Sequence, residues 1–308
     1  MKKFVYYSKN GLLKMMPRHY FKWNYLRLKK IENQIDINEI KDRVDYYFRK
    51  NTNFNLPKNI NNIRNFKNNN SSAYYYDMME YLYYFDPEIK ISYQFGDGLI
   101  KDDIPTFIKV RSLKKLENNS IIFKLNKIRH FNFINDKIDF KDKMNKLVWR
   151  GGAYRNIRKN FVKKFWNKKL FNVGQTNVPI ESVKWQKSKL TISQQLKYKF
   201  IFCPEGNDVA TNLKWVLSSN SLCFMPKPKY ESWFMEGRLK PNIHYIEIKD
   251  NFEDLEEKII YYTKKTKEAL DIIKNANQHV NKFKNSDCED IISIKIIEKY
   301  LKLSNQNL

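Results

Sequence analysis

The segment over residues 198–224 constrains the fold more than any other part of this chain. It reads YKFIFCPEGNDVATNLKWVLSSNSLCF: an apolar run, a tight turn at 205–208, a helical stretch and a second apolar run. A strand that enters a helix through a glycine turn places backbone N–H groups at the strand's carboxyl end, where α/β proteins hold phosphate. The GxGxxG fingerprint is absent. The segment therefore predicts an α/β fold with a ligand near the turn, without a standard dinucleotide site.

Composition allows one large domain or two of ordinary size in 308 residues. The net charge of +25 favours polyanionic partners, such as nucleic acid, an anionic membrane face or phosphorylated substrates. A general bias toward lysine explains the same charge equally well. The lysines are spread along the chain without a continuous basic block, which argues against a nucleic-acid-binding arm.

The cysteines and the apolar runs bear on the compartment. Cys203, Cys223 and Cys288 are widely spaced with no CxxC pair, which fits a reducing compartment and no zinc site. The first residues lack the long apolar core of a signal peptide, and no run approaches a membrane span. We expect a soluble cytoplasmic protein that can touch the inner face of an anionic plasma membrane.

Hydrophobic periodicity predicts a chain that alternates strand and helix after residue 147 and is richer in helix before it. We expect a domain at 1–145, a second domain at 146–285, and a C-terminal helix at 286–308 that can pack back on the first. Helices are predicted over 18–50, 156–167, 210–217, 254–283 and 290–303, and strands over 91–95, 107–110, 121–125, 147–149, 198–202, 222–225 and 243–248.

Only eight glycines occur, and several follow predicted strands. Asp97 lies between Gly96 and Gly98 at the end of one strand, where a carboxylate is placed to take a proton from a hydroxyl nucleophile. An ordinary turn aspartate, bonded to its own backbone, explains the same pattern.

A second glycine turn, Gly151–Gly152, follows Arg150, and Arg155 and Arg158 come next. Glycines let the backbone approach an anion, and one guanidinium group can donate two hydrogen bonds to phosphate oxygens. The pattern predicts a diphosphate site, and a solvated basic turn is the alternative.

The turn after the strand at 198–202 offers further polar groups. Glu205 can accept from ribose hydroxyls, as an acidic residue at a strand end does in nucleotide-binding folds. Asp208 is better explained as the N-cap of the next helix. The donor-binding candidates around this turn are Glu205, Gly206, Asn207, Asn212 and Lys214.

Four residues near strand ends are candidates for the acceptor side or the cleft: Lys109, Arg111, Arg129 and His130. A lone histidine is more often structural than catalytic. No HxH, HExxH or acidic-pair motif stands at a strand end, so no catalytic metal is expected.

Together these segments resemble glycosyltransferase family 90, and the bacterial lipopolysaccharide branch most. Ala210 and Asn212 depart from the eukaryotic branch, which often has Ser and Arg there, whereas Lys214 is retained. The matching pieces are SYQFGDG (92–98), IKVRSL (108–113), KLNKIRHF (124–131), LVWRGGAYRNIR (147–158), the stretch 198–226, ESWF (231–234) and 239–259.

The resemblance implies a GT-B fold, with two Rossmann-like domains facing a central cleft. It implies inverting, metal-independent transfer from a UDP-sugar to a lipopolysaccharide core or another surface glycan, with no cofactor and no nucleic-acid partner. Asp97 corresponds to the family's base, Arg150 and Gly151 to its diphosphate motif, and Arg155 to the basic residue that follows. The rival hypothesis is a non-catalytic basic module that binds nucleic acid or an anionic glycan.

Overall fold

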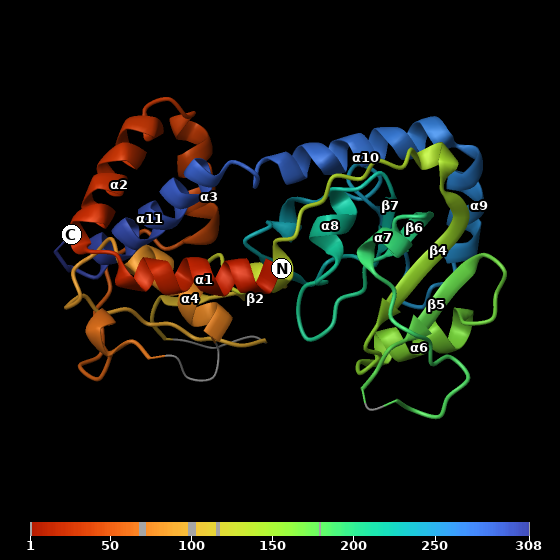
Figure 1. Cartoon of the computed structure of the whole chain (residues 1–308), viewed down its shortest axis with the longest axis horizontal. Helices are drawn as coiled ribbons and strands as arrows, with labels where there is room; N and C mark the ends of the chain where they lie inside the picture. The colour runs from red at the N-terminus through yellow and green to blue at the C-terminus, as the bar shows by residue number, and fades with distance from the viewer. Residues whose placement is uncertain (1, 68–71, 98–102, 115–117, 179, 308) are drawn as a thin grey trace. The chain divides into compact units, whose positions relative to one another are not determined.

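The computed structural model describes residues 2–67, 72–97, 103–114, 118–178 and 180–307 (Figure 1). The chain forms two compact units. Unit 1 comprises Met1–Arg129, Tyr230–Phe234 and Phe283–Leu308, and unit 2 comprises His130–Lys229 and Met235–Lys282.

Unit 2 is built on a five-stranded parallel sheet. The chain places β5 on one side of β4 and then β6 on the other side, so the direction of strand addition reverses between β4 and β6. Ligands of open parallel sheets bind at the carboxyl ends of the strands beside such a reversal. In spatial order the strands are β5 (Phe171–Gln175), β4 (Met144–Gly151), β6 (Tyr198–Phe202), β7 (Leu222–Met225) and β9 (Ile246–Glu247).

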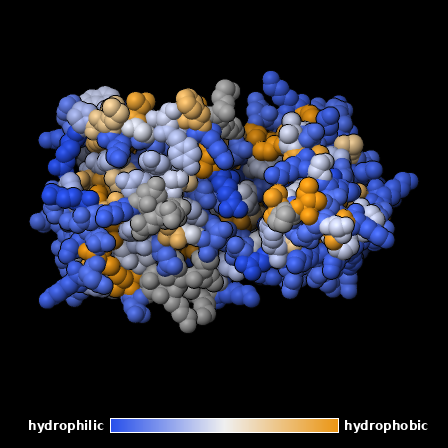
Figure 2. All heavy atoms as spheres, turned by 60° about the horizontal axis from the view of Figure 1, so that its bottom comes forward, coloured by the Kyte–Doolittle hydropathy of each residue, from blue (hydrophilic) through white to orange (hydrophobic). Residues whose placement is uncertain are grey.

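Aromatic side chains fill the core of unit 2. The ring of Phe161 lies 4.0 Å from that of Phe202, centroid to centroid, and the central strands β6 and β7 are buried on both faces, as is usual for parallel sheets. Hydrophilic residues cover most of the face shown in Figure 2, with apolar residues in small groups. The helices of this unit are α6 (Asn156–Phe165), which packs on β5, α9 (Leu255–Lys264) on β4, α10 (Thr266–Asn281) along β7 and α8 (Leu213–Leu217), and the short α7 (Ile192–Gln195).

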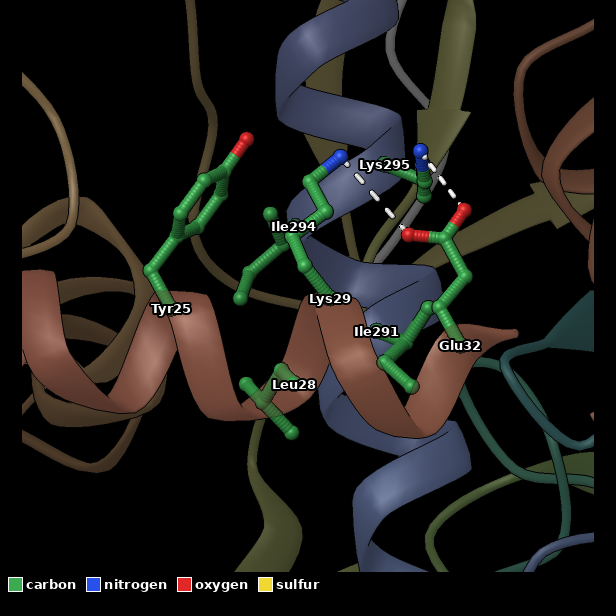
Figure 3. Close-up of a pocket in the computed structure, with 7 residues that line it drawn as sticks. All are labelled: Tyr25, Leu28, Lys29, Glu32, Ile291, Ile294 and Lys295. Atoms are coloured by element: carbon green, nitrogen blue, oxygen red, sulfur yellow. Dashed lines mark ion pairs between the residues drawn. The ribbon is translucent and has the colours of Figure 1, made fainter. Parts of the chain in front are cut away.

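Unit 1 is mainly helical. Figure 3 shows α2 crossing α11, with Leu28 and Ile291 at the crossing and Glu32 paired with Lys29 and Lys295. The crevice there has a volume of about 10 Å³, which is room for about one water molecule. Helix α11 (Ser286–Leu303) packs on α2 (Arg18–Glu32), α3 (Ile37–Tyr47) and α4 (Ser72–Leu82), and α1 (Lys2–Met15) packs on α4.

The strands of unit 1 form two short pairs. β1 (Thr106–Ile108) runs parallel to β3 (Ser120–Ile122), and β2 (Val110–Ser112) runs antiparallel to β8 (Tyr230–Ser232). The α/β class with parallel strands is confirmed, whereas the described residues of unit 1 do not show a second Rossmann-like sheet. The remaining elements are α5 (Lys127–His130), at the boundary of the two units, and the 3-10 turns η1 (Ile63–Asn65), η2 (Phe140–Asp142) and η3 (Glu236–Arg238).

The strands predicted over 198–202 and 222–225 are confirmed to the residue. The strand predicted over 91–95 is wrong: only Tyr93 forms a bridge, with Phe107, and neighbouring backbone groups bond to the same residue. The helix predicted over 254–283 is interrupted at Lys265, which separates α9 from α10. Helix α1 and strands β5 and β8 were not predicted.

Candidate functional site

Two glycine turns meet at the carboxyl edge of the unit 2 sheet. One follows β4 and contains Gly151 and Gly152; the other follows β6 and contains Gly206. Because β4 and β6 are parallel neighbours, their carboxyl ends lie at the same edge, beside the reversal of strand order. The structure thus brings together two motifs that lie more than fifty residues apart in the sequence.

Arg158 joins the two turns. Its guanidinium donates to the carbonyl oxygens of Gly152 (3.3 Å), Pro204 (3.0 Å) and Glu205 (3.1 Å). A Cβ atom on Gly206 would lie 2.9 Å from Nη2 of Arg158, so only glycine lets the turn approach this guanidinium so closely. Arg158 belongs to the arginine cluster predicted to bind a diphosphate, and in the structure its guanidinium contacts backbone carbonyls that no sequence pattern identifies.

Arg155 makes a second connection between the turns. Its Nε donates to Oδ1 of Asn207 at 2.6 Å, and both residues are exposed. A cation and an amide from two different strand ends therefore stand together at the protein surface. Guanidinium and amide groups in this arrangement are suited to phosphate oxygens.

Arg150 occupies a different environment from Arg155. Its Nη1 donates to the carbonyl of Asn172 at 2.7 Å, its Nη2 to Oδ1 of the same residue at 2.7 Å, and its Nε to the carbonyl of Ser188 at 3.2 Å. Partial burial lowers the pKa of this guanidinium from its ordinary value. The side chain of Arg150 thus braces β4 against β5 in this structure, and its contact with a diphosphate stays a prediction.

Gly151 is required by the packing of Trp149. A Cβ atom at Gly151 would lie 2.7 Å from the buried indole, which is held edge-on against Phe161. The glycine therefore lets the backbone of β4 pass close to a fixed ring at the point where the strand ends.

The polar residues after β6 are held by other parts of unit 2. Oε1 of Glu205 accepts from the backbone N–H of Lys229 at 2.9 Å, and Nδ2 of Asn212 donates to the carbonyl of Phe202 at 2.9 Å. Lys214 is completely buried, and its Nζ lies 2.5 Å from Oε1 of Glu236. The structure therefore places Glu205 and Asn212 within the turn and Lys214 in the interior of the unit.

The expected N-cap at Asp208 is wrong. Helix α8 begins at Leu213, and Asn212 is its N-cap residue. The segment before the helix continues as turns as far as Asn212, so Asp208 lies too far upstream to cap it.

Asp97 lies in unit 1, where its carboxylate contacts basic side chains. Its Oδ1 accepts from Nζ of Lys109 and from the hydroxyl of Tyr74 at 3.3 Å, and its Oδ2 lies 3.9 Å from Nη1 of Arg129. About a quarter of the carboxylate side chain, 28%, is exposed. Gly98, which the sequence analysis placed in the same turn, lies outside the described residues.

Opposing effects act on the pKa of Asp97. Partial burial raises it, but the hydrogen bond and charge of Lys109, with the charge of Arg129, outweigh burial and hold the pKa below its usual value. Asp97 is therefore ionised at neutral pH, as a proton acceptor must be.

The four acceptor-side candidates separate into two kinds. Lys109 and Arg129 face Asp97. Arg111 is fully buried, with its Nε 2.7 Å from Oε1 of Glu231, and His130 is buried at the end of α5. Tyr74 is buried in the core of unit 1, and its hydroxyl also donates to Asp97.

Among the residues that the structure describes, no three His, Cys, Asp or Glu side chains form a group that could hold a metal ion.

The fold and the two turns define an α/β protein whose sheet edge, with its glycine turns and exposed cation, is typical of proteins that bind phosphorylated ligands. Residues 124–307 match the model of Glycosyl transferase family 90. The chain is also 39% identical over 264 residues to the O-glucosyltransferase LpsA of Dichelobacter nodosus, across 86% of this chain and 83% of that relative. The chain belongs to glycosyltransferase family 90.

This membership favours the enzyme over the rival non-catalytic binding module. The match covers both glycine turns of unit 2 and begins after Asp97 and Lys109. The glycosyltransferase class is therefore established, and the role of Asp97 depends on its own geometry.

Proposed function

We propose that this chain is an inverting, metal-independent glycosyltransferase that moves a sugar from a UDP-sugar to a lipopolysaccharide core or another surface glycan. Family membership and the junction of the two turns through Arg155, Arg158 and Asn207 support the proposal. The name of the relative, an O-glucosyltransferase, makes glucose the first hexose to test ahead of galactose or a pentose such as xylose.

The donor half of the proposal uses the sheet edge of unit 2. The exposed Arg155 and Asn207 bind the diphosphate, and the backbone at Gly151 and Gly206 approaches it closely. Glu205 accepts from the ribose. Side-chain cations then offset the charge that grows on the departing UDP, which is the contribution that a metal makes in other transferases.

The acceptor half uses Asp97 as the general base. An acceptor hydroxyl gives its proton to Oδ2 of Asp97, and its oxygen forms a bond to the anomeric carbon of the donor. The bond from that carbon to the diphosphate oxygen breaks, the electron pair leaves with UDP, and attack from the opposite face inverts the configuration. The hydrogen bond of Lys109 to Oδ1 orients the carboxylate for this step.

The GT-B arrangement, in which an acceptor-side and a donor-side domain share one cleft, is part of this proposal. So is a cytoplasmic location, with peripheral contact to the inner membrane face where a lipid-linked acceptor is made.

The test is UDP release from a panel of UDP-sugars, with and without EDTA, for the wild-type protein and the Asp97→Asn and Arg155→Gln variants. We expect slow hydrolysis of one donor that is unaffected by EDTA, lost with Asp97→Asn, and shifted to a higher KM with Arg155→Gln. Absence of release, together with absence of a thermal shift with UDP, would contradict the donor site.

A further inference from the structure

Helix α1 has one face packed on unit 1. The hydroxyl of Tyr6 donates to Oδ1 of Asp77 at 2.6 Å and to the carbonyl of Ala73, and Nζ of Lys9 lies 2.8 Å from Glu80. Asn10 is buried on the same side and donates to the carbonyl of Tyr6. These contacts hold α1 on α4 and fix which of its faces points to solvent.

The opposite face of α1 is apolar and exposed. Phe4, Leu12 and Met15 are 77%, 60% and 79% exposed. Positions 4, 12 and 15 share one side of a helix, since eight and eleven residues are close to two and three turns. Large apolar side chains this exposed on a single helix face mark an interaction surface. We call Phe4, Val5, Leu12 and Met15 the α1 stripe.

Basic residues are concentrated in the segment that contains the α1 stripe. The first 31 residues contain nine lysines and arginines and no aspartate or glutamate, although the whole chain contains 33 acidic residues. Lys3 and Lys14 lie on α1, and Arg18 and Lys22 begin α2, which also exposes Trp23 and Leu26. A local excess of cations this strong does not follow from a lysine bias spread evenly along the chain.

A basic and aromatic pocket follows the α1 stripe in the chain. Its volume is about 740 Å³, and it is lined by three basic side chains, one carboxylate and aromatic rings, among them Arg18, His19, Lys22, Asp86, Tyr83 and Tyr84. Tyrosine rings and cations beside an apolar surface are the side chains that proteins place at the headgroup level of a bilayer.

We propose that α1 is a peripheral membrane-docking helix, whose α1 stripe enters the acyl region of an anionic leaflet while the cations of the same segment contact the headgroups. Among the described residues, no helix combines the length and apolar character needed to cross a bilayer. An amphipathic helix lies in the plane of the interface and needs both apolar insertion and charge attraction. The inference concerns unit 1 alone and does not depend on the chemistry proposed above.

The experiment is co-sedimentation of the full chain with vesicles of phosphatidylcholine alone or mixed with phosphatidylglycerol. We expect binding only to the mixed vesicles, weakened by salt. The Leu12→Gln/Met15→Gln double variant should lose about ten-fold in affinity for each substitution. Removing Lys14 by substitution with Gln should cost about five-fold.

The matched control is Ile260→Gln/Leu270→Gln, which removes two similarly exposed apolar residues from α9 and α10. It should bind vesicles like the wild type. Melting temperature and donor hydrolysis in detergent-free buffer should be unchanged in both double variants, because all four side chains are exposed.

Three results would overturn the inference. The first is equal binding to both vesicle types, and the second is equal binding by the wild type and the α1 double variant. The third is a wild type that forms a dimer and binds no vesicles while the α1 double variant is monomeric, which would make the α1 stripe a contact between two copies of the chain.

Discussion

Nε of Arg155 lies 2.6 Å from Oδ1 of Asn207, which joins the turn after β4 to the turn after β6. The two residues are separated by 52 positions in the sequence and become neighbours because β4 and β6 are adjacent parallel strands. The contact places a cation beside the reversal of strand order, where a diphosphate is expected to bind.

Asp97→Asn should abolish sugar transfer and leave UDP binding unchanged. The amide keeps the size of the carboxylate but does not accept a proton at neutral pH, and loss of a general base typically costs about 100- to 10,000-fold in rate. The rate of transfer and calorimetric affinity for UDP measure the two effects. Unchanged transfer would make Asp97 an ordinary turn residue.

Lys109→Met should shift the acid limb of the pH–rate profile to higher pH. Lys109 holds the pKa of Asp97 below its usual value, so without it Asp97 becomes protonated at a higher pH, and activity is lost earlier as the pH falls. Arg129→Gln should give a smaller shift in the same direction, because its Nη1 is 3.9 Å from Oδ2. If the pH profiles of kcat/KM for the wild type and the Lys109→Met variant coincide, Asp97 is not the base that titrates.

Gly206→Ala should destabilise unit 2 and weaken donor binding, because the added methyl group lies 2.9 Å from Nη2 of Arg158, which three carbonyls hold in place. Crowding of this kind costs about 1–3 kcal/mol. Gly11→Ala is the matched control: nothing lies within 4 Å of its added Cβ, and it is inside α1, so it should stabilise by about 0.5–1 kcal/mol. Denaturant unfolding and UDP affinity measure both. Equal effects of the two substitutions would contradict the packing role of Gly206.

Lys214→Met should lower stability strongly, since it leaves the buried carboxylate of Glu236 without its closest cation. Removing one partner of a buried ion pair typically costs about 3–5 kcal/mol. The Lys214→Met/Glu236→Leu double variant should recover much of this loss. Recovery of stability with normal UDP affinity would assign Lys214 a structural role, whereas recovery of stability with lost UDP affinity would restore it to the donor site.

Strands that are buried on both faces could be predicted from the sequence alone. β6 and β7 are continuous apolar runs, and their bounds match the prediction to the residue. β5 reads FNVGQ, with a glycine and two amides, and it forms only because β4 supplies its hydrogen bonds. The segment 91–95 has the apolar residues of a strand but does not form one. It forms a single bridge, at Tyr93, and the rings of Tyr93 and Phe95 pack against Phe66.

The polar residues beside the glycine turns were also visible in the sequence, because Arg150 and Glu205 follow apolar runs that form strands and Asp97 follows a glycine. The sequence did not show which of the charged groups remain accessible to solvent. Arg111 and Lys214 are buried against Glu231 and Glu236, whereas Arg155 is exposed.

The sequence by itself determined the α/β class, the exact bounds of two sheet strands and the residue types at the turns, because apolar runs and turn residues are local patterns in the chain. Only the tertiary structure decided that Arg158 joins the turns, that Arg150 braces β5 and that Lys109 controls Asp97. The partners in these three contacts are separated by 46, 22 and 12 positions in the sequence. A guanidinium or ammonium group binds whichever oxygen the fold brings within reach, and local sequence does not specify that oxygen.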